Sequence, residues 1–188
     1  MAEAKKKKKP LIVRFLKKVV NLGLFILAVL IITYLVSAFV CQRIVVHNVS
    51  MQETLTEGDI LIMDKITYKI RSPKRYEIIC FDSDYEREGL IKRVIGLPGE
   101  TVQITNGMIF INGNQIKDVE GLVKIEDPGR AAMEVHLSDD EYFVIGDNRP
   151  GSIDSRAEEI GNVKEEDIVG RAILRIYPFN KFGRIKTK

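Results

Sequence analysis

The feature that most constrains this chain is an apolar run without a single charged residue, between Lys18 and Arg43. It reads VVNLGLFILAVLIITYLVSAFVCQ and covers residues 19–42. A helix needs roughly 20 apolar residues to cross the hydrocarbon core of a bilayer, and this run supplies them. Its few polar residues are compatible with a span because a helix satisfies its own backbone hydrogen bonds in lipid. We therefore predict one transmembrane anchor helix over residues 19–42.

Basic residues gather before this run, against the single acid Glu3. They are Lys5–Lys9, Arg14, Lys17 and Lys18. Positive flanks stay on the cytoplasmic side, so residues 1–18 are predicted to be a cytoplasmic N-terminus and residues 43–188 an extracytoplasmic domain at the plasma membrane. A cleaved secretory peptide fits less well, because the run exceeds the usual ~7–15 apolar residues and no small-residue cleavage site follows. A nucleic-acid-binding arm also fits less well, because the basic run adjoins a membrane span.

Two classes of ligand do not fit the outer domain. The formal charge of +3 comes from the basic N-terminus, and the rest is close to neutral, so we expect no nucleic-acid partner. His47 and His136 have no second imidazole or cysteine at ligand spacing, so we expect no metal site. A disulfide between Cys41 and Cys80 is permitted outside the cell, but the apolar EIICF around Cys80 favours a buried free thiol.

The outer domain reads as short β-rich runs divided by turn residues, which favours an antiparallel sheet, sandwich-like or barrel-like, over a βαβ arrangement. The Asn106-Gly107 dipeptide favours the positive φ angles of a tight hairpin turn. Residues 118–140 are predicted to be an inserted hairpin or loop, and residues 157–167 to contain a short helical turn. The predicted strands are Arg43–Val49, Asp59–Tyr68, Tyr76–Phe81, Leu90–Gly96, Thr101–Thr105, Met108–Ile111, Tyr142–Asp147 and Val169–Pro178.

The segment VSMQETLTEGDI places a candidate nucleophile, Ser50, just after the first predicted strand. A serine nucleophile needs a neighbouring base to take its proton. His47 is three residues earlier in an extended run, which would place it on the opposite face of the strand. It is therefore a poor candidate for the base.

Lys92 is a better candidate. In LIKRVIG, period-2 alternation puts Leu90, Lys92 and Val94 on one face of a strand. Most lysines are solvated surface groups. An ammonium flanked by aliphatic side chains, however, loses solvent, which lowers its pKa and makes the neutral amine accessible near pH 7. Because Ser-Lys pairs are a variant of the catalytic triad, we predict that Lys92 takes the proton of Ser50.

The segment VIGDNRPGSIDSR, residues 144–156, is dense in polar and charged side chains after an apolar strand. A loop with ordinary turn chemistry would explain part of this composition. The density also suits a hydrogen-bonded and ion-paired shell that fixes other side chains.

Four segments, SMQETL, GDILIMDK, IKRVIGLPGE and GDNRPGSIDSR, follow the anchor in this order and resemble the conserved boxes of type I signal peptidases. The resemblance covers almost the whole chain from the anchor onward, and the single anchor is similar to the Gram-positive form. It implies a serine endopeptidase with an antiparallel β domain seated on the membrane surface and no cofactor. The implied partners are the signal peptides of exported preproteins and the lipid bilayer. We expect a monomer near the secretion machinery.

The resemblance also implies a role for each matching residue. Ser50 would be the nucleophile, Lys92 the general base, and Ser152 the group that orients the amine. The oxyanion would bind the Ser50 backbone N–H and one further donor, and Asn48 is either that donor or a plain turn residue. The remaining roles are two bracing ion pairs, Asp147–Arg93 and Asp154–Arg156, and shallow pockets for small residues at the first and third positions before the cut, near Met51, Leu55, Leu90 and Ile91.

One departure from the family pattern is Glu53, where relatives have proline. Glutamate leaves this segment looser, and a nearby carboxylate would raise the pKa of Lys92 unless solvent screens it. We expect lower activity or a more alkaline pH optimum than in Glu53→Pro. A non-catalytic or weakly active paralogue that binds signal peptides is the alternative function. A self-cleaving Ser-Lys repressor is excluded, because a membrane span occupies the place of its DNA-binding head.

Overall fold

The computed structural model describes residues 10–187, without the side chains of residues 37, 38, 87 and 88. The Lys5–Lys9 run therefore lies outside the described residues. The chain divides into two compact units, Met1–Val40 and Cys41–Lys188.

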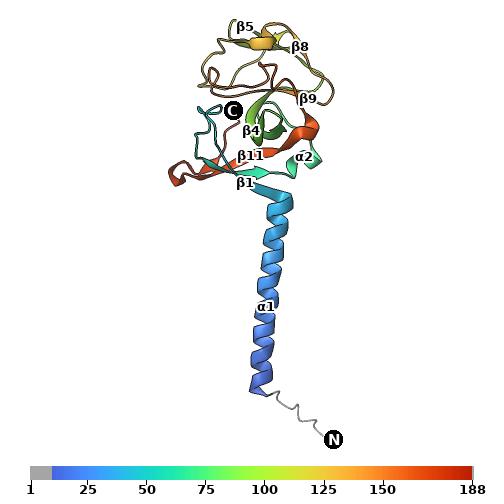
Figure 1. Cartoon of the computed structure of the whole chain (residues 1–188), viewed down its shortest axis with the longest axis vertical. Coiled ribbons are helices and arrows are strands. Elements are labelled where there is room, and N and C mark those ends of the chain that lie inside the picture. Colours follow the sequence, from blue (N-terminus) through green and yellow to red (C-terminus); the bar gives the residue numbers. More distant parts are fainter. Residues whose placement is uncertain (1–9, 188) are drawn as a thin grey trace. The chain divides into compact units, whose positions relative to one another are not determined.

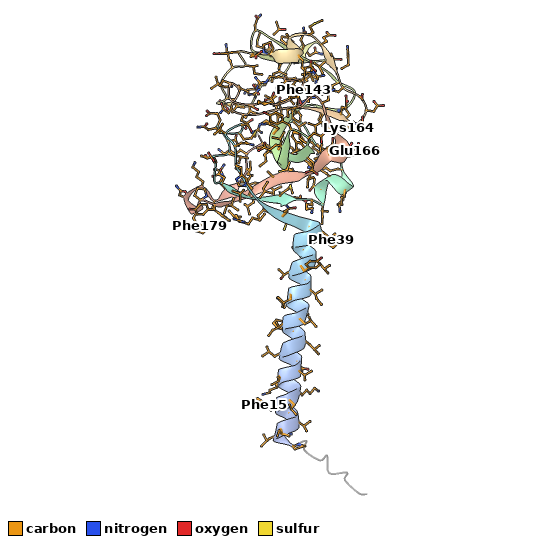
Figure 2. The ribbon with its side chains drawn as sticks, in the orientation of Figure 1. Phe15, Phe39, Phe143, Lys164, Glu166 and Phe179 are labelled. Atoms are coloured by element: carbon orange, nitrogen blue, oxygen red, sulfur yellow. The ribbon has the colours of Figure 1, made fainter. Side chains whose placement is uncertain are left out.

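The first unit contains one long helix, α1 (Leu11–Leu35), which continues into a π-helical turn, η1 (Val36–Val40). Among the described residues, α1 is the one helix long and apolar enough to cross a membrane, with a mean hydropathy of 2.3. It begins inside the predicted cytoplasmic segment, because Pro10 suits a helix start and no helix breaker follows before residue 19. Figure 2 shows the side chains of Phe15 and Phe39 pointing outward, and both are exposed.

The second unit is built on an eight-stranded sheet with antiparallel pairing, as the sequence predicts. Its order is β1-β2-β11-β3-β4-β9-β10, and β12 pairs with β11. The sheet is not closed into a barrel, because β1 and β10 are free edges among the described strands. The strands are β1 (Cys41–Val45), β2 (Ile60–Asp64), β3 (Ile78–Ser83), β4 (Glu86–Gly96), β9 (Glu141–Ile145), β10 (Val163–Lys164), β11 (Ile168–Tyr177) and β12 (Gly183–Arg184).

A second, four-stranded sheet has the order β7-β6-β5-β8. Its strands are β5 (Thr101–Thr105), β6 (Met108–Ile111), β7 (Asn114–Gln115) and β8 (Val135–His136). The predicted β5–β6 hairpin is confirmed, with positive φ at Asn106 (54°) and Gly107 (75°). Figure 1 shows β5 and β8 at the end of this unit opposite β1 and β11. Phe143, labelled in Figure 2 and 0% exposed, belongs to the core that joins β9 to this sheet.

Short helical elements replace parts of the predicted strands and loops. The predicted strand Asp59–Tyr68 ends as β2 at Asp64, whose side chain accepts hydrogen bonds from the backbone N–H groups of Ile66 and Thr67 at 2.9 and 3.0 Å. These bonds turn the chain after the strand, and the short helix α2 (Thr67–Ile70) follows. The 3-10 turns are η2 (Gly129–Ala132), η3 (Glu165–Asp167) and η4 (Phe179–Lys181).

The placement of β4 matters most for function. It pairs with β3 on one side and β9 on the other, so its residues lie in the interior of the eight-stranded sheet. Leu90 and Val94 pack in one buried cluster with side chains of β3 and β9. A second cluster lies beneath the segment that follows β1 and contains Val46, Met51, Leu55, Leu61, Ile78, Ala172 and Ile185.

Candidate active site

Ser50 lies in a tight turn after β1. Its residue is 5% exposed, and its Oγ donates a hydrogen bond to Asn48 Oδ1 at 2.8 Å. The residues after Ser50 form a hydrogen-bonded turn, in which the Met51 carbonyl accepts from the backbone N–H groups of Thr54 and Leu55. Strand β1 ends at Val45, so the alternation of side chains along a strand does not apply to His47. The His47 side chain is exposed.

Lys92 is buried in the interior of the sheet. It is 1% exposed and stands opposite Ile79 of β3. Among the side chains that the structure describes, Lys92 forms no ion pair. Burial lowers the pKa of its amine from 10.5 to about 8, although the negative charges of Asp154 and Glu86 raise it. A substantial neutral fraction is therefore present near physiological pH.

Gly146 is the point at which the candidate residues converge. In the β4–β9 ladder, Arg93 pairs with Ile145, so the register extended by one residue aligns Lys92 with Gly146. A Cβ atom at Gly146 would lie 2.2 Å from Ser152 Oγ and 2.4 Å from the Ser50 carbonyl oxygen. Only a residue without a side chain at position 146 allows Ser50 and Ser152 to approach the backbone this closely.

The Ser152 hydroxyl is buried at this junction. Its Oγ has no hydrogen-bond partner among the residues that the structure describes. Buried hydroxyls are normally paired, so an unpaired one beside a lysine strand is suited to hold an amine or a substrate atom.

The structure brings Arg93 and Asp147 together in a bidentate ion pair. Arg93 Nε donates to Asp147 Oδ1 at 2.8 Å and Arg93 Nη2 to Asp147 Oδ2 at 2.6 Å, with both side chains essentially unexposed. The Thr54 hydroxyl also donates to Asp147. The pair thus connects β4, the loop after β9 and the turn after the candidate nucleophile.

A second ion pair joins Asp154 and Arg156. Arg156 Nε donates to Asp154 Oδ1 at 2.8 Å and Arg156 Nη2 to Asp154 Oδ2 at 2.9 Å. Asp154 Oδ2 also accepts from the backbone N–H of Gly146 at 2.9 Å, and Arg156 Nη2 donates to the Ser152 carbonyl at 3.3 Å. This pair therefore fixes the backbone around Gly146 and Ser152.

Asn148 connects the loop after β9 to the turn at residues 49–55 that contains Ser50, which we call the nucleophile turn. Its backbone N–H donates to the Ser50 carbonyl and its Nδ2 to the Val49 carbonyl, both at 3.0 Å. The sequence alone indicates no individual role for Asn148, Gly146 or Thr54. The dense polar segment around Asn148 was the one signal for these contacts, since their partners are distant in the chain.

A groove runs beside the nucleophile turn. It is lined by the end of β1 with His47 and Asn48, and by β3 and β4 residues that include Leu90, Ile91 and Glu86. Met51 and Leu55, which we expected near the substrate pockets, do not line it. Both are 0% exposed and pack beneath the groove, in the cluster against which Ile44 and Ile91 pack.

Glu53 is exposed, and the carboxylates that raise the pKa of Lys92 are those of Asp154 and Glu86. Solvent therefore screens the expected effect of the Glu53 charge. Among the described residues, no three His, Cys, Asp or Glu side chains gather so that they could hold a metal ion. Both cysteines are free, and Cys80 is buried.

Comparisons with known proteins give a consistent result. Residues 19–177 match the family described as signal peptidase, peptidase S26. The signal peptidase I of Leptolyngbya laminosa is 36% identical over 158 residues, which cover 80% of this chain and 75% of that protein. The signal peptidase I P of Bacillus subtilis subsp. natto is 31% identical over 171 residues, 87% and 91% of the two chains. A crystal structure of a signal peptidase I from Enterococcus faecalis V583 shares 32% identity with a TM-score of 0.45, covering 54% of this chain and 97% of that one.

Proposed function

The chain belongs to the signal peptidase family, peptidase S26, and from that premise we propose that it removes signal peptides from exported preproteins with Ser50 as nucleophile and Lys92 as general base. The observation that carries this proposal is the buried Lys92 amine, whose pKa is lowered to about 8 and whose register aligns it with Gly146. The glycine is also the neighbour of the Ser50 carbonyl and the Ser152 hydroxyl.

The proposed reaction has two stages. Neutral Lys92 removes the proton of Ser50 while Oγ attacks the scissile carbonyl, and the resulting oxyanion is bound by the Ser50 backbone N–H with Asn48 as the second donor. The protonated amine then passes its proton to the leaving amine of the mature protein. Water, deprotonated by Lys92, hydrolyses the acyl-enzyme and releases the signal peptide.

Ser152 and the two ion pairs are positioning groups in this scheme. The unpaired Ser152 hydroxyl accepts a hydrogen bond from the Lys92 amine and directs it toward Ser50. The Arg93–Asp147 and Arg156–Asp154 pairs hold the two backbone segments that meet at Gly146. Such support matters because small displacements of a catalytic group cost large factors in rate.

The shape of the groove suits a substrate that binds in an extended conformation and has small side chains. Leu90 and Ile91 form an apolar wall beside Asn48. Ile91 packs against the cluster that contains Met51 and Leu55, and Leu90 belongs to the buried cluster with Val94, so the wall cannot recede to admit large residues. We assign the small residues at the first and third positions before the cut to this groove, which selects by exclusion.

Helix α1 is the proposed anchor in the plasma membrane, with the basic N-terminus in the cytoplasm and the catalytic unit outside. Its exposed apolar side chains suit contact with lipid. A monomer near the secretion machinery is sufficient, because Ser50, Lys92 and Ser152 all come from one chain.

The proposal is tested by cleavage of a purified preprotein by the full-length protein in detergent. Ser50→Ala and Lys92→Ala should each lower the rate by at least ~10³-fold. The matched control is Lys164→Ala, which removes an exposed lysine paired with Glu166 at 3.8 Å, shown in Figure 2, and should cut like wild type. Retained cleavage by either active-site variant contradicts the mechanism. A wild type that binds the preprotein without cutting it supports the non-catalytic alternative.

A further inference from the structure

Arg149 has more hydrogen-bond donors than the fold satisfies. It is 2% exposed, and its Nη2 donates to Asp118 Oδ1 at 2.8 Å. Its Nε and Nη1 are also buried, and neither has an acceptor among residues 10–187. Leaving buried donors unpaired costs free energy, so folded proteins normally supply such groups with water or a ligand.

Arg149 is one of the residues that line a cavity of about 640 Å³. Ser152 lines the same cavity, and its Oγ faces the position at Gly146 that also adjoins the Ser50 carbonyl. The groove that contains Asn48 and Leu90 is a different hollow, since among the described residues none lines both. The groove therefore lies on the Asn48 side of the candidate site, and the cavity lies on the Ser152 side.

The chemistry of the cavity wall identifies its ligand class. The wall is partly apolar, with Val123 and Ile153, and carries charges of both signs, on Lys124, Arg149, Glu126 and Asp127. Arg156 is already engaged by Asp154, and Arg149 by Asp118. Because the charges nearly balance, the wall does not favour a strong anion. What it has in excess is hydrogen-bond donors, on Arg149 and Ser152.

Carbonyl oxygens of an extended peptide complement such donors, and aliphatic walls tolerate varied side chains. We propose that this cavity binds the first residues of the mature protein, just after the cleaved bond, through hydrogen bonds from Arg149 to their backbone carbonyls. The inference rests on the proposed function, because it requires a peptide that crosses Ser50 with its signal-peptide side in the groove. Recognition of the main chain suits a segment whose sequence differs among preproteins.

The test compares two peptides with the same signal sequence and cleavage site. One ends just after the cleaved bond, and the other continues into a longer mature segment. With wild type, the longer peptide should have a kcat/KM about tenfold higher, as expected for one or two additional hydrogen bonds. In Arg149→Lys, which keeps the charge but loses the planar fork, the ratio of the two kcat/KM values should fall toward one.

The matched control is Arg130→Lys. Arg130 is half-buried, donates to Asn162 at 3.0 Å and does not line the cavity, so this variant should keep the wild-type ratio. Ile153→Trp provides a second variant if Arg149→Lys proves unfolded by thermal denaturation. Ile153 is 46% exposed on the cavity wall, and the indole should block the hollow and lower the ratio as well.

Three outcomes overturn the inference. These are equal rates of wild type on the two peptides, an unchanged ratio in folded Arg149→Lys, and an unchanged ratio in Ile153→Trp. Failure of wild type to cut either peptide contradicts the proposed function itself, whereas cleavage without a length effect contradicts only the role of the cavity.

Discussion

Lys92 owes its chemistry to two opposed influences on one amine. Burial lowers its pKa, and the carboxylates of Asp154 and Glu86 raise it, with a result of about 8. At pH 7 roughly a tenth of the amine is then neutral, compared with well under a thousandth for a solvated lysine. Cleavage by a neutral lysine should therefore rise with pH and level off above the pKa.

Glu86→Gln tests this balance. Removing the negative charge of Glu86 lowers the pKa of Lys92, so a larger fraction of the amine is neutral at a given pH. The rising limb of the kcat/KM profile should move to lower pH, most clearly at low ionic strength. The control is Asp84→Asn, an exposed acid between β3 and β4 that does not line the groove. A profile that stays in place, or moves to higher pH, would contradict the assignment of Lys92 as the base.

At the scale of elements, the site depends on how β9 ends. The strand stops at Ile145, and the next residue, Gly146, is where the nucleophile turn and the Ser152 loop meet β4. Two hydrogen bonds fix the loop that follows. The Gly146 N–H donates to the Asp154 carboxylate, and the Asn148 N–H donates to the Ser50 carbonyl. The arrangement requires close backbone contact that a side chain would prevent.

Gly146→Ala should therefore lower kcat/KM by about 10²-fold or more, because the added methyl group pushes Ser50 and Ser152 apart. The matched control is Gly170→Ala, whose Cβ would lie 2.5 Å from the Asp64 carbonyl, between β11 and β2. Both variants should lower the melting temperature, and only Gly146→Ala should lose far more activity than its stability change explains. If the loss of kcat/KM relative to the drop in melting temperature were the same in both variants, Gly146 would have no special steric role at the site.

Elements set by local chemistry could be predicted from the sequence, and those set by distant contacts could not. The β5–β6 hairpin follows from Asn106-Gly107, and the apolar run Leu90–Gly96 predicts the second part of β4, which begins at Glu86. The strands β7, β8, β10 and β12 are two residues long each, and such short runs carry no periodic pattern. The residues of helix α2 were predicted as strand because the apolar run gave no sign that the Asp64 side chain binds the backbone N–H groups of Ile66 and Thr67 and ends the strand.

The same division holds for the candidate site. The resemblance of the four sequence boxes named Ser50, Lys92 and Ser152, and the structure places Ser50 and Ser152 around a glycine aligned with Lys92. The role of Gly146 and the shared hydrogen bonds of Thr54 and Asn148 involve partners far away in the chain, which spacing alone cannot indicate. Met51 and Leu55 were expected near the pockets, and the structure buries both in the cluster against which Ile44 and Ile91 pack.

For the whole molecule, the chain comprises one unit that contains helix α1, up to Val40, and a β-sheet unit from Cys41. The proposed orientation can be measured at Cys41, which is half-buried, because Cys80 should not interfere. Burial raises the pKa of the Cys80 thiol to about 12, which keeps it protonated and unreactive. A membrane-impermeant maleimide should label the wild type in intact cells.

Two variants control this measurement. Cys41→Ser should abolish the label, and Ala2→Cys added to Cys41→Ser should restore it only after the cells are permeabilised. Labelling of Ala2→Cys in intact cells would reverse the proposed orientation, since the basic N-terminus would then lie outside.

The hydrogen bond from Ser50 to Asn48 affects how readily the Ser50 hydroxyl reacts when no peptide is bound. A hydroxyl has one proton, so while Asn48 accepts it the oxygen cannot hand it to an amine. The Ser50 hydroxyl must therefore rotate away from Asn48 before Lys92 can take its proton, and we expect a peptide in the groove that competes for Asn48 to favour this rotation. Small electrophiles that never enter the groove should inactivate the enzyme far more slowly than peptide-shaped ones of equal intrinsic reactivity.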